Sequence, residues 1–285
     1  MTYQHGPVLS EHHARIHALY AVAGDQARDR HGVAEVTPGD AVGFELPGGL
    51  RAPWLLLRGR RREDPVLTPV VLLADPAVPG AFTDAASALA AWDGLDATLR
   101  VRLAPVAAPA VERLLEAGFV VRKWVLEGAV ETAHTRLAGR PTLEDRGFRV
   151  APMESADLDA ATDLRARFFA SDPASGFGIP GVTCLREQLE RFHATLPIDL
   201  AVWDGDRFVG HVQCGVEGGI GLVLDADLRG RGLGWSVYAT LVPRMLALGI
   251  SRMRGLTNAP AVLHMGLAMG REVVETWIGR PGVPT

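Results

Sequence analysis

A glycine-rich segment in the C-terminal half constrains the fold of this chain more than any other part of its sequence. The apolar run 220–224 precedes the glycines, and residues 235–247 after them have helical character. A strand, a tight turn and a helix are therefore expected in that order. Such a turn presents backbone N–H groups, uncovered by side chains, at the positive end of a helix dipole, which suits a diphosphate group.

The order of the glycines separates this segment from two other phosphate-binding loops. A P-loop needs Gly-x-x-x-x-Gly-Lys-Ser/Thr, and no lysine is present here. A dinucleotide-binding fingerprint needs Gly-x-Gly-x-x-Gly near the start of a βαβ unit. Gly230, Gly232 and Gly234 have a different spacing and lie late in the chain.

Arg229, Gly232 and Gly234 instead fit the pattern Arg/Gln-x-x-Gly-x-Gly/Ala. With this pattern the segment resembles the acyl-CoA diphosphate loop of the GNAT acyltransferase superfamily, and the resemblance extends over roughly residues 147–280. It implies that acetyl-CoA, or another acyl-CoA, is the cofactor. The residues expected to hold it are Leu222, Val223, Leu224, Arg229, Gly230, Arg231, Gly232, Leu233, Gly234 and Asn258. For Arg229 and Arg231, a solvated turn charge is an equal alternative.

A short internal repeat suggests two copies of one domain. Ala108-Pro109-Ala110-Val111 recurs 151 residues later as Ala259-Pro260-Ala261-Val262. In both places proline can begin a helix, a glycine follows near the helix end, and a strand is expected next. We therefore predict an α/β fold of the α+β type, with a mixed sheet, in two tandem GNAT-like domains spanning 1–140 and 147–285.

The N-terminal copy lacks an equivalent of the glycine loop. Residues 75–84 stand in its place, where Pro79 has no N–H to offer, Phe82 would crowd a phosphate and Asp84 would repel it. We expect this copy to be degenerate and structural, so CoA should bind only to the C-terminal copy.

The resemblance also implies that the strand 220–224 contacts the pantetheine arm and that a backbone N–H polarises the thioester carbonyl. A base must take a proton from the acceptor amine. Glu217, just before this strand, is the first candidate, followed by His211 on the preceding strand and Asp225 at the strand's end. A turn carboxylate and a satisfied strand histidine remain the alternatives for Glu217 and His211.

The general acid departs from the family pattern. Many members carry a tyrosine seven residues after an asparagine that corresponds to Asn258, but Met265 occupies that position here. The neighbouring His264 is the candidate that could protonate the leaving thiolate. Protonation by water, with His264 as an ordinary helix residue, is the alternative.

Acceptor recognition is expected in the connection 165–180, which mixes arginines and aromatic residues with glycine and proline. Long connections of this kind are often functional, and arginine suits a carboxylate or phosphate on a ligand. The candidate substrate residues are Arg165, Phe168, Phe169 and Asp172. A helix end followed by a plain loop explains the same pattern equally well.

Composition excludes several other classes of function. The net charge of −4 gives no indication of nucleic-acid binding, and the two cysteines provide neither a disulfide framework nor metal-ligand spacing. No apolar run is long enough to span a membrane, and the N-terminus does not resemble a signal peptide. We expect a cytoplasmic monomer or homodimer without a metal.

These features together predict a GNAT-type N-acetyltransferase that transfers an acetyl group directly from acetyl-CoA to a small-molecule amine. Two alternatives remain open. One is a non-catalytic acyl-CoA-binding or interaction protein. The other is an acyltransferase with a carrier-protein or other macromolecular acceptor, for which the basic cluster 58–62 is a candidate contact.

Overall fold

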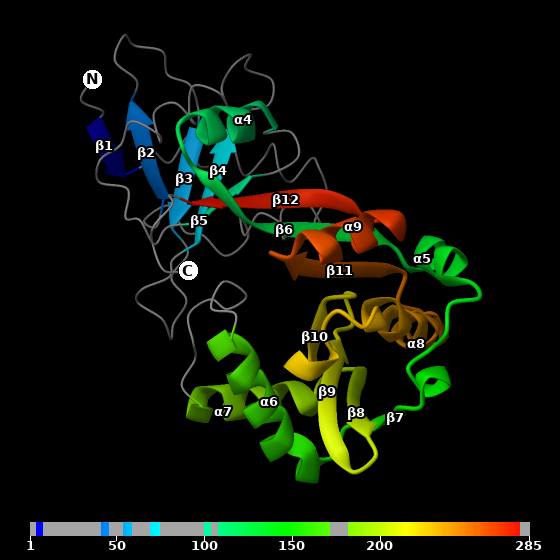
Figure 1. Cartoon of the computed structure of the whole chain (residues 1–285). Coiled ribbons are helices and arrows are strands. Elements are labelled where there is room, and N and C mark those ends of the chain that lie inside the picture. The colour runs from blue at the N-terminus through cyan, green and yellow to red at the C-terminus, as the bar shows by residue number, and fades with distance from the viewer. Residues whose placement is uncertain are drawn as a thin grey trace. The chain divides into compact units, whose positions relative to one another are not determined.

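An antiparallel sheet of four strands forms the centre of the C-terminal half in the computed structural model (Figure 1). Its order is β10-β9-β8-β7, and the β8–β9 hairpin turns at Gly205, which has a positive φ. The strands are β7 (Arg149–Pro152), β8 (Ile198–Asp204), β9 (Arg207–Cys214) and β10 (Ile220–Leu224).

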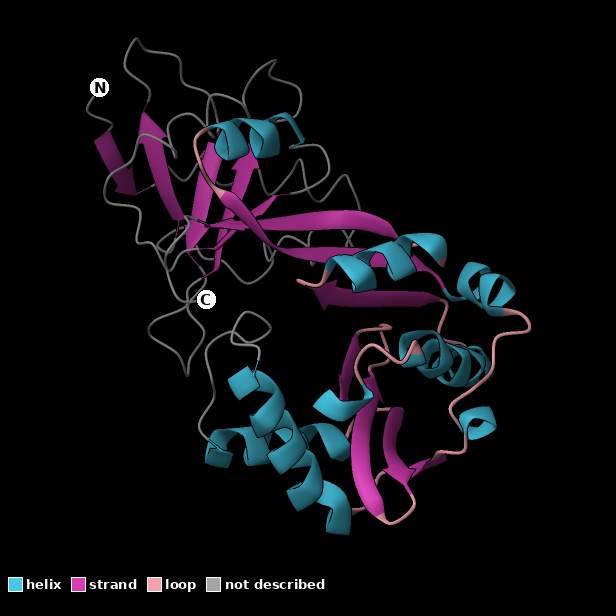
Figure 2. Cartoon of the chain, in the orientation of Figure 1, coloured by secondary structure: helices cyan, strands magenta, loops and turns pink. Residues whose placement is uncertain are grey.

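Helices pack against both faces of this sheet (Figure 2). Alternation along β8 separates the two cores: Leu200 and Val202 face α8, while Ala201 faces α6 and α7. The polar residues Asp199, His211 and Gln213 share the register of Ala201 and therefore lie on the α6 and α7 face. The helices are α5 (Val130–Leu137), α6 (Leu158–Ser171), α7 (Val182–His193), α8 (Leu233–Ala247) and α9 (Pro260–Ala268).

The structure describes residues 4–7, 41–45, 54–58, 69–74, 100–103, 108–171 and 182–279. The chain divides into two units, one from Val125 to Val273 and the other joining Met1–Trp124 to Val274–Thr285. The domain limits 1–140 and 147–285 stay a prediction. The interpretations of residues 75–84 and of most of the basic cluster 58–62 lie outside the described part.

The other unit contains a sheet in which β4 pairs parallel to β5, whereas β1 with β2, β2 with β3, β3 with β4 and β5 with β12 pair antiparallel, so the sheet is mixed as predicted. Its strands are β1 (Gln4–Pro7), β2 (Ala41–Glu45), β3 (Trp54–Arg58), β4 (Pro69–Ala74) and β5 (Arg100–Leu103). Helix α4 (Ala108–Glu116) follows β5 along the chain.

The repeat predicted from Pro109 and Pro260 is present as two matching runs of elements. β5, α4 and β6 (Val120–Ala129) correspond in order to β11 (Arg252–Thr257), α9 and β12 (Glu272–Gly279). The strand order in this sheet is β5-β12-β6-β11, so β12 lies next to β5 and β6 lies next to β11. The last strand of each run therefore lies next to the first strand of the other run.

No helix in the described part of the chain combines the length and the apolar character that crossing a lipid bilayer requires.

Candidate functional site

Strands β10 and β11 meet at one end and separate beyond it. A parallel bridge joins Gly219 to Arg254, and the Arg254 N–H donates to the Gly218 carbonyl at 2.8 Å. From Ile220 onward β10 pairs with β9 on one edge, and within the described residues its other edge has no strand partner. Alternate residues of an antiparallel edge strand direct their N–H and C=O groups outward. Part of the backbone of 220–224 is thus available to an extended ligand.

Glycine is required at the point where the two strands meet. Gly218 has a φ of 80°, and a Cβ built on it would lie 1.8 Å from the carbonyl oxygen of Arg252. This close approach of two backbones is possible only without a side chain. Glu217, the first candidate base, precedes this glycine in an exposed turn closed by the Gly218 N–H donating to the Gly215 carbonyl at 2.9 Å.

The predicted glycine loop lies at the opposite end of β10, before α8. Gly230 and Gly232 have φ values of 75° and 72°, and a Cβ on either would have no atom within 4 Å. Gly232 is the N-cap of α8 without a side-chain cap bond, and the first turn of the helix carries no acidic residue. The first N–H groups of an α-helix have no partner within the helix. These uncovered amides fit a diphosphate.

Helix α9 approaches the first turn of α8 closely. A Cβ on Gly234 would lie 3.0 Å from Sδ of Met265, the residue that occupies the position of the family tyrosine. His264, the candidate acid, is exposed on α9. Asn258 is half-buried in the turn before α9, where the Ala259 N–H donates to the Thr257 hydroxyl at 3.0 Å.

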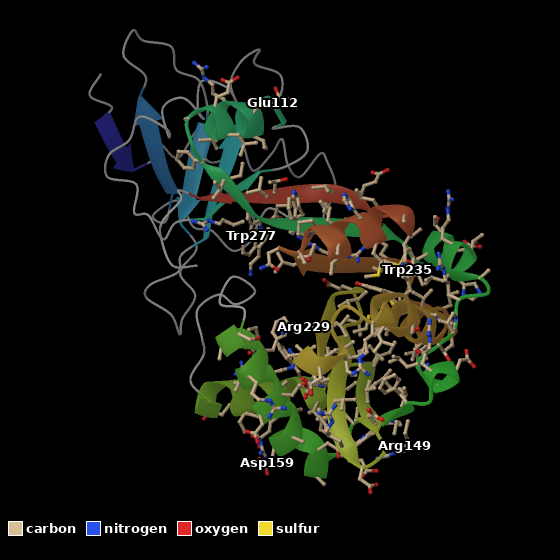
Figure 3. All side chains as sticks on the ribbon, in the orientation of Figure 1. Glu112, Arg149, Asp159, Arg229, Trp235 and Trp277 are labelled. Atoms are coloured by element: carbon tan, nitrogen blue, oxygen red, sulfur yellow. The ribbon has the colours of Figure 1, made fainter. Side chains whose placement is uncertain are left out.

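The C-terminal end of α6 is joined to the glycine loop by two arginines. Arg229, labelled in Figure 3, donates to the Ser171 hydroxyl at 3.2 Å. Its guanidinium lies 5.1 Å from the centre of the Phe168 ring. Arg167 lies 3.7 Å from the Asp225 carboxylate. Phe168 also packs edge-to-face against Phe169 at 5.7 Å, so these two substrate candidates lie near the loop, while Asp172 lies outside the described residues.

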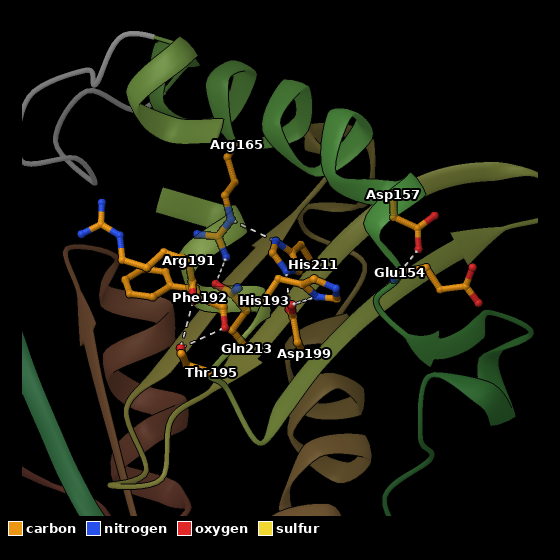
Figure 4. A network of polar contacts seen from close by, with 10 residues as sticks. All are labelled: Glu154, Asp157, Arg165, Arg191, Phe192, His193, Thr195, Asp199, His211 and Gln213. Atoms are coloured by element: carbon orange, nitrogen blue, oxygen red, sulfur yellow. Dashed lines mark hydrogen bonds and ion pairs between the residues drawn. The ribbon is translucent and has the colours of Figure 1, made fainter. Parts of the chain in front are cut away.

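A chain of hydrogen bonds connects α6 to β8, β9 and α7 (Figure 4). Nε of Arg165 donates to Nδ1 of His211 at 3.0 Å, and Nη2 donates to Oε1 of Gln213 at 2.7 Å. His211 Nε2 donates to one oxygen of Asp199 at 2.6 Å, and His193 Nδ1 donates to the other at 3.0 Å.

The partners determine the protonation state of His211. The guanidinium of Arg165 can only donate, so Nδ1 of His211 must accept and the proton must lie on Nε2, facing Asp199. Burial, the largest cause, lowers the pKa of His211, and the charge of Arg165 lowers it further, whereas the hydrogen bond to Asp199 opposes the shift. The ring is therefore neutral near pH 7.

The two charged members of this chain also have shifted pKa values. Burial raises the pKa of Asp199, but the hydrogen bonds from His211 and His193 outweigh it, so the pKa lies below its usual value. Burial lowers the pKa of Arg165 to about 10, against the opposing charge of Asp199. Both groups are therefore charged at neutral pH, and the ring of His211 lies between them.

The structure brings some predicted residues together and not others. Arg165 and His211 are hydrogen-bonded, although the sequence indicated separate roles for them. Glu217 lies at the end of β10 remote from the glycine loop, and His264 is on α9.

Sequence reasoning missed Asp199 and Gln213, whose signal was a polar residue at an inward position of an otherwise apolar strand. Within the described residues no cluster suited to a metal ion is present.

No protein-family model matches the sequence, and no curated protein matches it. Similar solved structures include a GCN5-related N-acetyltransferase from Sphaerobacter thermophilus, at 16% identity and a TM-score of 0.60, covering 99% of this chain and 98% of that one. An acetyltransferase of the GNAT family from Colwellia psychrerythraea is 11% identical, with a TM-score of 0.58 and 98% of both chains covered. A tandem GNAT protein from the clavulanic acid biosynthesis pathway is 12% identical, with a TM-score of 0.50 and 97% of both chains covered. The chain therefore has the fold of the GNAT acetyltransferases in its tandem form, as the glycine loop and the repeat predicted.

Proposed function

We propose that the protein is a GNAT-type N-acetyltransferase that transfers an acetyl group directly from acetyl-CoA to a small-molecule amine. One observation carries this proposal: the edge of β10 that pairs with no described strand runs from Ile220 towards the uncovered amides at the start of α8. An extended pantetheine arm followed by a diphosphate has the same order of chemical groups. The fold shared with GNAT acetyltransferases supports the same assignment.

The proposed cofactor contacts come from two segments. Backbone groups of Leu222, Val223 and Leu224 would hold the pantetheine arm, and Asn258 would contribute from the turn before α9. The N–H groups from Arg229 to Gly234 would hold the diphosphate, with Gly230 and Gly232 allowing close approach. Acetyl-CoA, when bound, supplies a thioester carbonyl that a backbone N–H of β10 would polarise.

Glu217 is the proposed base. It is exposed, and it lies where β10 and β11 begin to separate. His211 was the second candidate, but both of its ring nitrogens are engaged, one by Arg165 and the other by Asp199. His211 could accept a proton on Nδ1 only if the hydrogen bond from Arg165 were broken, so we assign it a positioning role. His264, exposed on α9, remains the proposed acid.

Release of free CoA thiol from acetyl-CoA in the presence of a panel of primary amines tests the activity. We expect release that depends on both the amine and the enzyme. Glu217→Gln should lower kcat by about 100-fold or more, because a general base contributes 10²–10⁴-fold. Glu187→Gln, which changes an exposed carboxylate on α7, is the matched control and should retain wild-type kcat.

The absence of the family tyrosine favours a second candidate, a non-catalytic acyl-CoA-binding protein. Met265 has no proton to donate, and its side chain lies against the first turn of α8. Saturable CoA binding without thiol release on any amine would support this candidate and contradict the acetyltransferase. An acceptor carried by a protein would instead show thiol release only when the carrier is present.

A further inference from the structure

Arg165 is a cation without a carboxylate partner among the residues that the structure describes. Its two hydrogen bonds go to neutral acceptors, Nδ1 of His211 and Oε1 of Gln213. The oxygens of Asp199 are engaged by His211 and His193 and make no ion pair with Arg165. A guanidinium has five N–H donors, so three donors of Arg165 are left over.

The orientation of the guanidinium is fixed from two sides. His211 is itself held by Asp199 at 2.6 Å and is fully buried, and Gln213 is 5% exposed. The amide of Gln213 must present its oxygen to Arg165, because a guanidinium cannot accept. These contacts hold the head group of Arg165 against the sheet and restrict the directions in which it can bind anything else.

The guanidinium lies beside the central strand of the proposed site. A Cβ built on Gly221 of β10 would lie 3.7 Å from Nη2 of Arg165 and 3.6 Å from Oε1 of Gln213. The glycine therefore leaves uncovered the place where Arg165 approaches the strand proposed to hold the thioester. The acceptor amine has to reach the same strand, from the α6 and α7 face or from the open edge.

We infer that Arg165 binds a carboxylate group of the acceptor, so that the acceptor is an amino acid or another amine that carries a carboxylate. This inference rests on the proposed function, because it names the acceptor class for the same site. Buried charges in proteins are usually paired, and arginine pairs best with a planar carboxylate. Burial lowers the pKa of Arg165 to about 10, and a bound anion would oppose that shift by favouring the charged guanidinium.

A carboxylate suits this place better than a phosphate dianion. Asp199 contributes a negative charge within the same chain of hydrogen bonds. Of the nearby arginines on α6 and the loop, Arg167 pairs with Asp225, while Arg229 contacts Ser171 and Phe168. Arg231 is exposed on the glycine loop, where it is a candidate contact of the diphosphate. Among the described residues Arg165 is therefore the guanidinium that lies next to Asp199, and it matches a single negative charge.

Binding of product-like molecules tests the inference without requiring turnover. N-acetylglycine, N-acetyl-β-alanine and N-acetyl-L-phenylalanine, each with its primary amide, are titrated calorimetrically into the full-length protein saturated with CoA. N-acetylphosphoethanolamine serves as the phosphate arm. We expect at least one carboxylate to bind about 10- to 100-fold more tightly than its amide, as expected for hydrogen bonds to a charged group.

Two variants and a control separate recognition from folding. Arg165→Met should remove the preference for carboxylate over amide. Gln213→Glu should also remove it, because an internal carboxylate then occupies Nη2 of Arg165 with almost no change in shape. Arg191→Met removes an exposed arginine from α7 and should keep the preference. Unchanged CoA affinity in each variant shows that the fold and the cofactor site are intact.

Three results would overturn the inference: equal affinity of the wild type for acids and amides, tighter binding of the phosphate, or a preference that survives in both Arg165→Met and Gln213→Glu. Failure of the proposed function has a different signature. In that case CoA binds but no amine, with or without a carboxylate, releases its thiol, whatever the outcome of the titrations.

Discussion

At the scale of single residues, His211 makes the protein sensitive to acid. Its folded pKa is below the ordinary value of 6.5, so the folded state keeps the ring neutral while the unfolded state takes up a proton. The free energy of unfolding should therefore fall as the pH drops below about 6.5, by up to about 1.4 kcal/mol per pH unit. Asp199 has a lowered pKa as well, and its contribution to the free energy of unfolding is lost only at lower pH, where its carboxylate takes up a proton.

Urea unfolding at pH 7.0 and pH 5.5 measures this dependence. We expect His211→Gln to be less stable than the wild type at pH 7.0, since it disturbs the contacts with Arg165 and Asp199, and to lose less stability on acidification. His134→Gln replaces an exposed histidine on α5 and should keep the wild-type dependence. An unchanged difference between the two pH values in His211→Gln would contradict the account.

Residue identities could be predicted from the sequence more readily than their contacts. Both Arg165 and His211 were candidate site residues. Arg165 was expected to bind an anionic group of the acceptor, and His211 was expected to act as a base. The sequence does not show that the two side chains are in contact. Asp199 and Gln213 stand directly opposite each other on β8 and β9. A polar residue in an alternating strand usually indicates a solvated face, and only the covering helices α6 and α7 turn this face into an interior.

At the scale of elements, the junction of β10 and β11 depends on Gly218. Gly218→Ala would place a Cβ 1.8 Å from the Arg252 carbonyl oxygen, so the two strands would have to move apart. Gly205→Ala is the matched control, since Gly205 also has a positive φ and an added Cβ would meet nothing within 4 Å. It should cost only the left-handed backbone strain of about 1–2 kcal/mol.

Chemical denaturation and CoA titration of both variants measure the difference. We expect Gly218→Ala to lose more stability than Gly205→Ala and also to bind CoA more weakly, because the edge of β10 shifts. Equal losses of stability with unchanged CoA affinity would show that the junction does not position the site.

Elements next to the glycine loop were predictable because an apolar run and the glycines themselves indicate where a strand ends and a helix begins. The strand expected at 220–224 is β10. The helix expected from 235 begins at Leu233, because Gly232 in the left-handed region acts as its N-cap. The separation of β10 from β11 had no local signal, since strand pairing depends on residues more than thirty positions apart.

At the scale of the whole molecule, the order β5-β12-β6-β11 makes each half dependent on a strand from the other run of elements. The fragment 130–285 lacks β6, the neighbour of β11, but keeps α5 and Leu143 of the core around α8, whereas the fragment 119–285 retains all three. We expect the longer fragment to unfold cooperatively and at higher urea concentration than the shorter one. Equal unfolding midpoints would contradict a structural role for β6 in the C-terminal unit.

The repeat at Pro109 and Pro260 indicated two copies, but it could not indicate this arrangement. The matching segments predict a helix, a glycine and a strand in each copy. This local pattern is the same whether the strand pairs within its own copy or with a strand of the other copy. Which of the two pairings forms depends on their relative stability, and four matching residues do not indicate that stability.

The amides at the start of α8 are proposed to hold the diphosphate of CoA, and this claim is tested by calorimetric titration of CoA into Gly232→Asp. Gly249→Asp is the control, because Gly249 has the same φ of 72° and equal space around an added Cβ but lies after the end of α8. We expect Gly232→Asp to weaken CoA binding by about 100-fold or more through like-charge repulsion, and Gly249→Asp to retain wild-type affinity. Equal affinity of both variants and the wild type would contradict the claim.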